Sequence, residues 1–402
     1  MRKLTLILAV LPQFSATQDP DTTLSSQVRE IIQKVDKGRL RKNIEKLVTF
    51  KQRNTLANWE LATEGPGAAA RWLKTELESA SKGSKMKASV EVHSYDARGV
   101  KAQNVYVWYK AKKDPNRVVI FGAHFDSCAT KDGRDPALPA PGANDNGSGT
   151  SAVLELTRIL AGYSFETSLI LIAFSGEEQG LLGARAFSKH LKEQSFQVVG
   201  MVNADIIGGS KGDDGAVDEN TIRCFSVGPE SSSHRVLARY IKGVGETYQP
   251  EFKIRIQDRP DRPGRGGDHQ AFSDAGFTAA RVVSTLEELR KQHNSRDLID
   301  NVDFEYLVRS TRLIASVIAN LAGGPPAPEK VEAKPGAVTI KGASGPYVVF
   351  VRKSGSNDLD RVVRSEKPAV EIQGLAAGDA VSVSAVGKTG EIGPPSPEVV
   401  VE

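Results

Sequence analysis

The spacing of apolar positions changes along this chain, and each spacing predicts a kind of element. Residues 23–50 and 67–81 carry apolar side chains three or four positions apart, which predicts two amphipathic helices, broken at Gly38, and then a third. Residues 88–92 and 104–109 alternate apolar and polar side chains, which predicts a hairpin at the edge of a sheet. A continuous apolar run such as the one that precedes His124 is typical of a strand buried on both faces.

Helical and extended patterns then alternate from residue 148 onward. Residues 148–161 and 181–191 predict helices, and residues 169–174 and 198–205 predict buried strands. Each strand-helix-strand unit is long enough for a parallel crossover connection. We therefore expect an α/β fold in which a mostly parallel central sheet is flanked by helices.

The composition changes at residues 323–328, Gly-Gly-Pro-Pro-Ala-Pro, which predicts a linker. Beyond it the pattern is strand-rich and helix-free, which predicts a small all-β sandwich over residues 324–402. Its segments 374–378 and 393–396 resemble turns of fibronectin type III domains, although the corner tyrosine of that fold is missing. We expect a binding or spacing module that contacts a surface or a substrate protein.

The first residues predict a signal peptide over residues 1–17. Met1-Arg2-Lys3 is followed by a short apolar run and by the small pair Ser15-Ala16. The alternative is a buried N-terminal helix or strand. We expect the remaining domain, residues 18–323, to be secreted, in the periplasm or outside the cell. No stretch is long enough for a stable membrane insertion.

Composition and charge exclude several classes of protein. The 402 residues are 39% hydrophobic and 25% charged, which is typical of a large globular domain with a small accessory one. The net charge of +4 arises from 53 basic and 49 acidic residues without a dense basic run, so we expect no nucleic-acid partner. Cys128 and Cys224 are too few for a disulfide scaffold or a cysteine-based zinc module; they either pair or remain separate thiols.

Polar side chains follow the predicted buried strands directly. His124 comes after the first of them, Glu177 and Glu178 after the second, and Asp205 at the end of the third. In open parallel sheets, functional groups collect just beyond the carboxyl ends of the strands. Three separate segments therefore deliver polar groups to one edge of the sheet.

The segment Pro-Gly-Ala-Asn-Asp-Asn-Gly-Ser-Gly-Thr, residues 141–150, places Asp145 at its centre. Alone, Asp145 would cap a helix, and the pair Glu177-Glu178 would begin one. Together with His124, however, adjacent carboxylates after a buried strand favour bound cations. Oxygen and imidazole ligands, a bridging group and a base are what a pair of water-activating metal ions needs. Asp126, in the order His-x-Asp, would orient the imidazole.

Four segments carry a resemblance to a known family: Gly-Ala-His-Phe-Asp-Ser, Pro-Gly-Ala-Asn-Asp-Asn-Gly-Ser-Gly, Ser-Gly-Glu-Glu-Gln-Gly and Asn-Ala-Asp. Over residues 40–322 the chain resembles the zinc aminopeptidases of metallopeptidase family 28, which include bacterial leucine aminopeptidases. The resemblance implies a zinc exopeptidase fold with two zinc ions per chain. It implies the ligands Asp145, which bridges both ions, His124 and Asp205 at one ion, and Glu178 and His293 at the other.

The resemblance also implies roles beyond the ligands. Glu177 would be the general base, Asp126 would orient His124, and Asp268 and His269 would have auxiliary roles near the substrate pocket. A cis peptide bond is expected after Asp145. His293 departs from the family pattern, which has His-Thr where this chain has His-Asn, but Asp297 keeps the carboxylate that follows it in that pattern. His269 is the competitor of His293.

The implied function is hydrolysis of the N-terminal peptide bond of peptides or proteins. A carboxypeptidase or dipeptidase on the same scaffold is the nearest alternative, with Arg262, Arg265 and Arg281 as candidate clamps for a substrate carboxylate. A single-zinc acyltransferase of the glutaminyl cyclase type and a non-catalytic, receptor-like ectodomain are the others.

Overall fold

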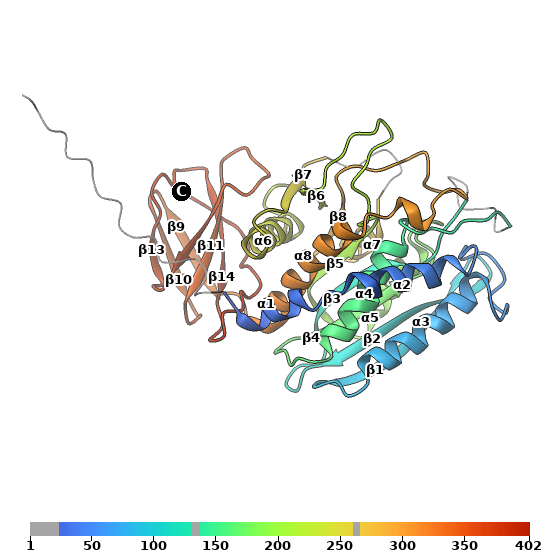
Figure 1. Cartoon of the computed structure of the whole chain (residues 1–402). Helices are drawn as coiled ribbons and strands as arrows, with labels where there is room; N and C mark the ends of the chain where they lie inside the picture. Colours follow the sequence, from blue (N-terminus) through green and yellow to red (C-terminus); the bar gives the residue numbers. More distant parts are fainter. Residues whose placement is uncertain (1–23, 130–134, 136, 260–265) are drawn as a thin grey trace, which may run out of the picture.

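The computed structural model describes residues 24–129, 135, 137–259 and 266–402 (Figure 1). The predicted signal peptide lies outside these residues. Among the residues described, no helix is both long and apolar enough to cross a membrane.

An eight-stranded mixed sheet forms the centre of the larger domain. In spatial order its strands are β1 (Lys87–Ala97), β2 (Val100–Lys110), β4 (Ser168–Phe174), β3 (Arg117–His124), β5 (Gln197–Ala204), β8 (Ala279–Ser284), β6 (Thr221–Phe225) and β7 (Lys253–Gln257). Strands β4, β3, β5 and β8 run parallel to one another, whereas β2 is antiparallel to β4 and β6 is antiparallel to β8. Strands β1 and β2 form an antiparallel hairpin at the edge. The predicted α/β class and edge hairpin are confirmed.

Helices cover both faces of the sheet. One face carries α1 (Ser26–Gln33), α2 (Lys37–Val48), α3 (Gly65–Ser81), α4 (Gly147–Leu160), α6 (Ser233–Tyr248) and α8 (Phe304–Gly323), and the other carries α5 (Leu182–Glu193) and α7 (Asp268–Asp274). In β3, Val119 and Phe121 join the first core, while Val118 and Ile120 join the second. Burial on both faces explains the continuous apolar run.

The break between the first two helices lies before Gly38, not at it. Helix α2 begins directly after Asp36, whose carboxylate accepts the Arg39 N–H at 2.7 Å, and Gly38 lies in its first turn. A side-chain cap, rather than the glycine, therefore sets this boundary.

The C-terminal residues form two antiparallel sheets, as expected for a small all-β domain. One has the order β13 (Ala369–Glu371), β10 (Ala337–Lys341), β9 (Lys330–Lys334), and the other β12 (Arg361–Ser365), β11 (Tyr347–Arg352), β14 (Ala380–Ala385), β15 (Val399–Val400). Valines from both sheets share one core. The fibronectin type III-like topology, the binding role and the exact domain limits stay predictions.

The second of these sheets packs on α6 through β11 (Figure 1), and the segment after β14 contacts α8, where the Asn320 side chain accepts the Ile392 N–H at 2.7 Å. Arg239 of α6 and Arg352 of β11 both donate to the buried carboxylate of Glu398, at 2.8 and 2.9 Å. The Tyr240 hydroxyl donates to the carbonyl oxygen of Ile392 at 2.5 Å. The C-terminal domain and the larger domain therefore meet in a buried interface.

Replacing Glu398 with alanine should destabilise this interface strongly. It leaves the guanidinium groups of Arg239 and Arg352 buried without their shared carboxylate, and breaking a buried pair costs about 3–5 kcal/mol. Asp358→Ala is the matched control, because that carboxylate pairs with Lys242 across the same interface but is half exposed. Denaturant unfolding measures both free energies. Equal, small losses would contradict a buried interface.

Candidate metal centre

Strand β3 lies between the next two strands of the chain, with β4 on one side and β5 on the other, so the strand order reverses at β3. A crevice for functional groups forms outside the carboxyl ends of the strands at such a point. His124 ends β3, Glu177 and Glu178 follow β4, and Asp205 follows β5. The predicted meeting of these side chains at one edge is confirmed.

Asp145 is held at this edge of the sheet by the start of α4. The next residue, Asn146, caps the helix by accepting the Gly149 N–H at 2.9 Å, and its side-chain amide donates to the Ala204 carbonyl at 2.9 Å. A Cβ atom on Gly149 would meet that carbonyl oxygen at 2.7 Å, so glycine permits this close approach. The peptide bond between Asp145 and Asn146 is cis, as expected.

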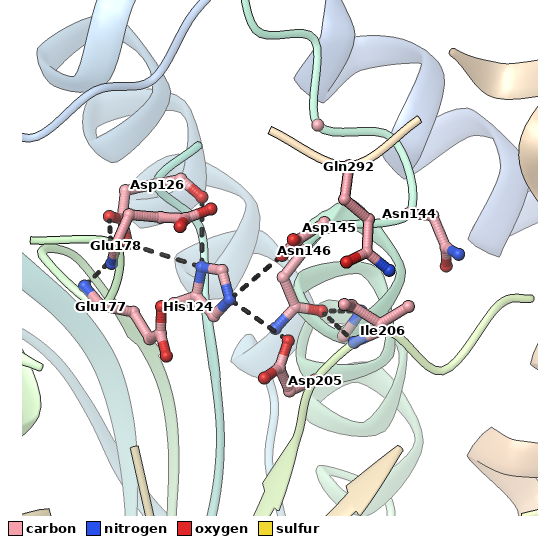
Figure 2. A network of polar contacts seen from close by, with 12 residues as sticks. His124, Asp126, Asn144, Asp145, Asn146, Glu177, Glu178, Asp205, Ile206 and Gln292 are labelled. Carbon is pink, nitrogen blue, oxygen red and sulfur yellow. Dashed lines mark hydrogen bonds and ion pairs between the residues drawn. The ribbon is translucent and has the colours of Figure 1, made fainter. Parts of the chain in front are cut away.

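The two carboxylate oxygens of Asp145 face two different imidazoles. His124 Nε2 lies 3.5 Å from Asp145 Oδ1 and 3.4 Å from Asp205 Oδ1 (Figure 2). His293 Nε2 lies 3.2 Å from Asp145 Oδ2 and 3.1 Å from Glu178 Oε2. Tetrahedral zinc with ligands at about 2.0–2.2 Å places neighbouring ligand atoms roughly 3.3–3.6 Å apart. We call the cluster around His124 the first position and the cluster around His293 the second position. Each of the two positions fits one zinc ion of its own.

The segment that carries His293 also supports Asp145. Asp297, four residues later, accepts the N–H groups of Asn144 and Asp145 at 3.0 and 2.8 Å. His293 has a φ of 52°, a left-handed conformation that is uncommon for non-glycine residues and is found often at functional sites. The sequence identified Asp297 only as the carboxylate that follows His293 in the family pattern. Its contact with the backbone of Asp145 was not predicted.

The carboxylates of the site lie close together, which favours the binding of cations. Burial, and then the neighbouring Asp145, raise the pKa of Glu178 well above its usual range. Burial alone would lower the pKa of His124, but Asp126 and Asp205 raise it far above the ordinary value. Glu178 Oε1 is also buried, and it has no hydrogen-bond partner among the described residues. Crowded carboxylates and an orphaned oxygen are what divalent cations relieve, so these residues fit a metal pair.

Asp126 contacts more than the imidazole that it was expected to orient. Its Oδ1 lies 3.5 Å from His124 Nδ1, although the Asp126 carbonyl oxygen is nearer, at 3.1 Å. Its carboxylate also accepts the N–H groups of Glu177 and Glu178, at 3.2 and 3.3 Å (Figure 2). Asp126 therefore fixes the backbone of the two-glutamate segment as well as the ring.

Glu177 lies beside the first position. A carboxylate oxygen of Glu177 is within 4.8 Å of the ligand atoms of His124 and Asp205. The side chain is half-buried, and desolvation raises the pKa of Glu177 to about 7. A carboxylate whose pKa is near neutral can both accept and release a proton.

Asp268 and His269 lie next to the site but are not brought into either ligand cluster. Both are buried, and both Asp268 oxygens lack a hydrogen-bond partner among the described residues. Burial, and then Glu177, raise the pKa of Asp268 well above its usual range, while burial lowers the pKa of His269 to about 3. Their auxiliary role stays a prediction. His269 does not compete with His293 for a ligand position.

Of the three arginines considered as carboxylate clamps, only Arg281 falls within the described residues. It is buried and donates to Asp205 Oδ2 at 3.0 Å. Its guanidinium therefore neutralises the outer oxygen of a candidate metal ligand.

Arg53 is a site residue that the sequence did not reveal. It is fully buried, and its guanidinium donates to the carbonyl oxygens of Phe125, Pro141 and Gly142, at 2.5, 2.5 and 2.8 Å. These carbonyls belong to the two loops that carry Asp126 and Asp145. Burial lowers the pKa of Arg53 only to about 10, so it stays charged and balances the carboxylates.

Replacing Arg53 with methionine should weaken zinc binding about 10–100-fold, the usual effect of losing a group that orients metal ligands. Arg71→Met is the control, because Arg71 also donates to backbone carbonyls but lies on the exposed face of α3. Competition with a chromogenic chelator measures both affinities. Unchanged zinc affinity in a folded Arg53→Met protein would remove Arg53 from the site.

Comparisons with known proteins agree with this geometry. The sequence profile of peptidase family M28 matches residues 104–318. A "Probable zinc metalloprotease" of Pyrenophora tritici-repentis is 32% identical over 340 residues, which cover 76% of this chain and 78% of that protein.

Two solved structures share the fold. The LapA aminopeptidase of Legionella pneumophila aligns with a TM-score of 0.61 at 20% identity, over 79% of this chain and 81% of that one. A glutaminyl cyclase of Bacteroides thetaiotaomicron aligns with a TM-score of 0.54 at 17% identity, over 71% and 98%. At these identities the likeness concerns the fold alone. Since the family profile spans more than half of the 402 residues and includes all five candidate metal ligands, the chain belongs to peptidase family M28.

Proposed function

We propose that this M28 peptidase is a di-zinc aminopeptidase that hydrolyses the N-terminal peptide bond of peptides or proteins. The observation that carries the proposal is the placement of Asp145, whose two oxygens face His124 and His293 separately. One carboxylate shared by two ligand sets favours a pair of ions over a single one. We also propose export, on the basis of residues 1–17.

The chemistry divides between the ions and the chain. When bound, two zinc ions polarise the scissile carbonyl and make a water molecule more acidic. Glu177 accepts the proton of that water and passes it to the leaving amine. Asp126 keeps Glu177 in place through its backbone N–H, and Arg53 holds the loops on either side.

Charge supports an aminopeptidase over a carboxypeptidase. The two carboxylate oxygens of Asp268 lack a hydrogen-bond partner among the described residues, and Asp268 lies near Glu177, so this carboxyl group suits the ammonium group of a free N-terminus. Arg281 is occupied by Asp205 instead of facing a substrate carboxylate. The fold likeness to the LapA aminopeptidase is consistent with this choice.

Paired peptides test the proposal. One peptide has a free N-terminus, a second is N-acetylated, and a third begins with glutamine; each is assayed before chelation, after it and after zinc is restored. We expect loss of the first residue from free peptides only, abolished by chelation and recovered with zinc. Cleavage at the C-terminal end would indicate a carboxypeptidase, loss of ammonia from the third peptide a glutaminyl cyclase, and inertness of all three a non-catalytic protein.

The pH dependence of kcat/KM should show an acidic limb from Glu177. A base works in its ionised form, so activity falls as the pH drops through the pKa of Glu177. Desolvation raises that pKa to about 7, and bound cations lower it, so the limb should lie between the ordinary 4.5 and about 7. A pH-rate profile of the zinc-loaded enzyme checks this. Activity that rises as the pH falls through this range would contradict the role of Glu177.

A further inference from the structure

Cys128 lies beside the second position. Its Sγ, a carboxylate oxygen of Glu178 and a ring nitrogen of His293 all lie within 4.8 Å of one another. Cys128 follows Asp126 by two residues in the loop after β3, and its side chain is only 3% exposed. Within the part of the chain that the structure describes, the buried Oε1 of Glu178 has no hydrogen-bond partner.

The surroundings of the two cysteines differ. Cys224 lies on β6 in the apolar core with Ile222 and Val282, and neither cysteine forms a disulfide. Cys128 is absent from that core and instead lies among carboxylates and an imidazole. Apolar packing accounts for the first cysteine only. Thiolate, imidazole and carboxylate together form a zinc donor set.

We propose that Cys128 is a ligand of the second zinc ion, together with Glu178, His293 and the shared Asp145. This inference rests on the proposed two-zinc function. Four protein donors complete the coordination number of a closed zinc site, and the thiol proton is released to solvent on binding. A zinc ion that takes part in the reaction needs an open coordination position. We therefore assign the bond between the Cys128 thiolate and zinc to the enzyme without substrate. The soft donor makes the second position prefer zinc to manganese.

X-ray absorption at the zinc edge tests the proposal on the unmodified protein. Loaded with two zinc ions, it should show a zinc-sulfur distance of about 2.3 Å beside zinc-nitrogen and zinc-oxygen distances of about 2.0–2.2 Å. With one sulfur for two ions, the average is half a sulfur per zinc. The absence of a sulfur shell would overturn the proposal.

Cobalt substitution identifies the sulfur. The unmodified protein and Cys224→Ala should both show a near-ultraviolet thiolate-to-cobalt absorption band, and Cys128→Ser should lack it. Zinc affinity at the second position should also fall about tenfold or more in Cys128→Ser. A band that survives in Cys128→Ser would overturn the assignment.

The metal count separates this inference from the function on which it rests. Two zinc ions bound without sulfur refute the Cys128 ligand and leave the di-zinc aminopeptidase intact. A single zinc ion per fully loaded chain refutes the two-zinc function itself.

Discussion

Replacing Glu177 with glutamine should lower kcat about 100-fold or more while both zinc ions stay bound. Glutamine keeps the shape of the side chain but cannot take a proton from water. The ligand pairs, His124 with Asp205 and His293 with Glu178, do not include Glu177, so zinc content should not change. Steady-state kinetics and elemental analysis of the same preparation measure the two quantities.

Two further variants show whether the loss of turnover is specific to the role of Glu177 as the base. Glu193→Gln, which alters an exposed glutamate at the end of α5, should keep full activity. Glu178→Gln should lose zinc as well as activity, because Glu178 faces His293 at the second position. A Glu177→Gln enzyme with near-normal turnover would remove Glu177 as the base, and one that also lost zinc would make it a ligand.

Replacing Asp145 with alanine should remove both zinc ions and, with them, the activity. Each oxygen of Asp145 serves a different position, 3.5 Å from His124 Nε2 and 3.2 Å from His293 Nε2. A bridging ligand is shared, so its loss weakens both ions together. Helix α4 should persist, because Asn146 and not Asp145 supplies its cap. Zinc content after dialysis, with circular dichroism to check folding, measures the effect.

The single-position variants are the matched controls for Asp145→Ala. Asp205→Asn should weaken the first ion and Glu178→Gln the second, each leaving about one zinc ion per chain. Two independent mononuclear sites would give a different pattern. In that case Asp145→Ala would still retain one ion at normal affinity.

Four of the five candidate ligands stand out in the sequence because each of these four follows or lies in a strong pattern, whereas His293 does not. A buried strand is an uninterrupted apolar run, so the polar residue at its end stands out, as His124 and Asp205 do. The parallel order of β4, β3 and β5 then brings these ends together. Asp145 and Glu178 lie in distinctive glycine-containing segments.

The supporting contacts of Arg53 and Asp297 could not be predicted in the same way, although Asp297 follows His293 as it does in the family pattern. Arg53 binds backbone carbonyls, and Asp297 binds backbone N–H groups. Because nearly every residue carries both groups, such partners leave no pattern of side chains to recognise. Only the folded loops show that these two charges hold Asp145 in place.

The glycines of the predicted linker, residues 323–328, are compatible with more than one kind of structure. Gly324 belongs to the segment 323–328, whose composition predicts a linker. In the structure, a Cβ atom on Gly324 would meet the backbone nitrogen of Gly393 at 2.3 Å, so the glycine permits close packing between the two parts. Composition alone does not distinguish a glycine that allows motion from one that allows contact.

The most direct test of the two-zinc site is a crystal structure of the zinc-loaded protein with anomalous diffraction recorded at the zinc edge. We expect two peaks that share Asp145, one also contacted by His124 and Asp205 and the other by Glu178 and His293. A single peak at full zinc loading, or a second peak away from His293, would contradict the di-zinc centre.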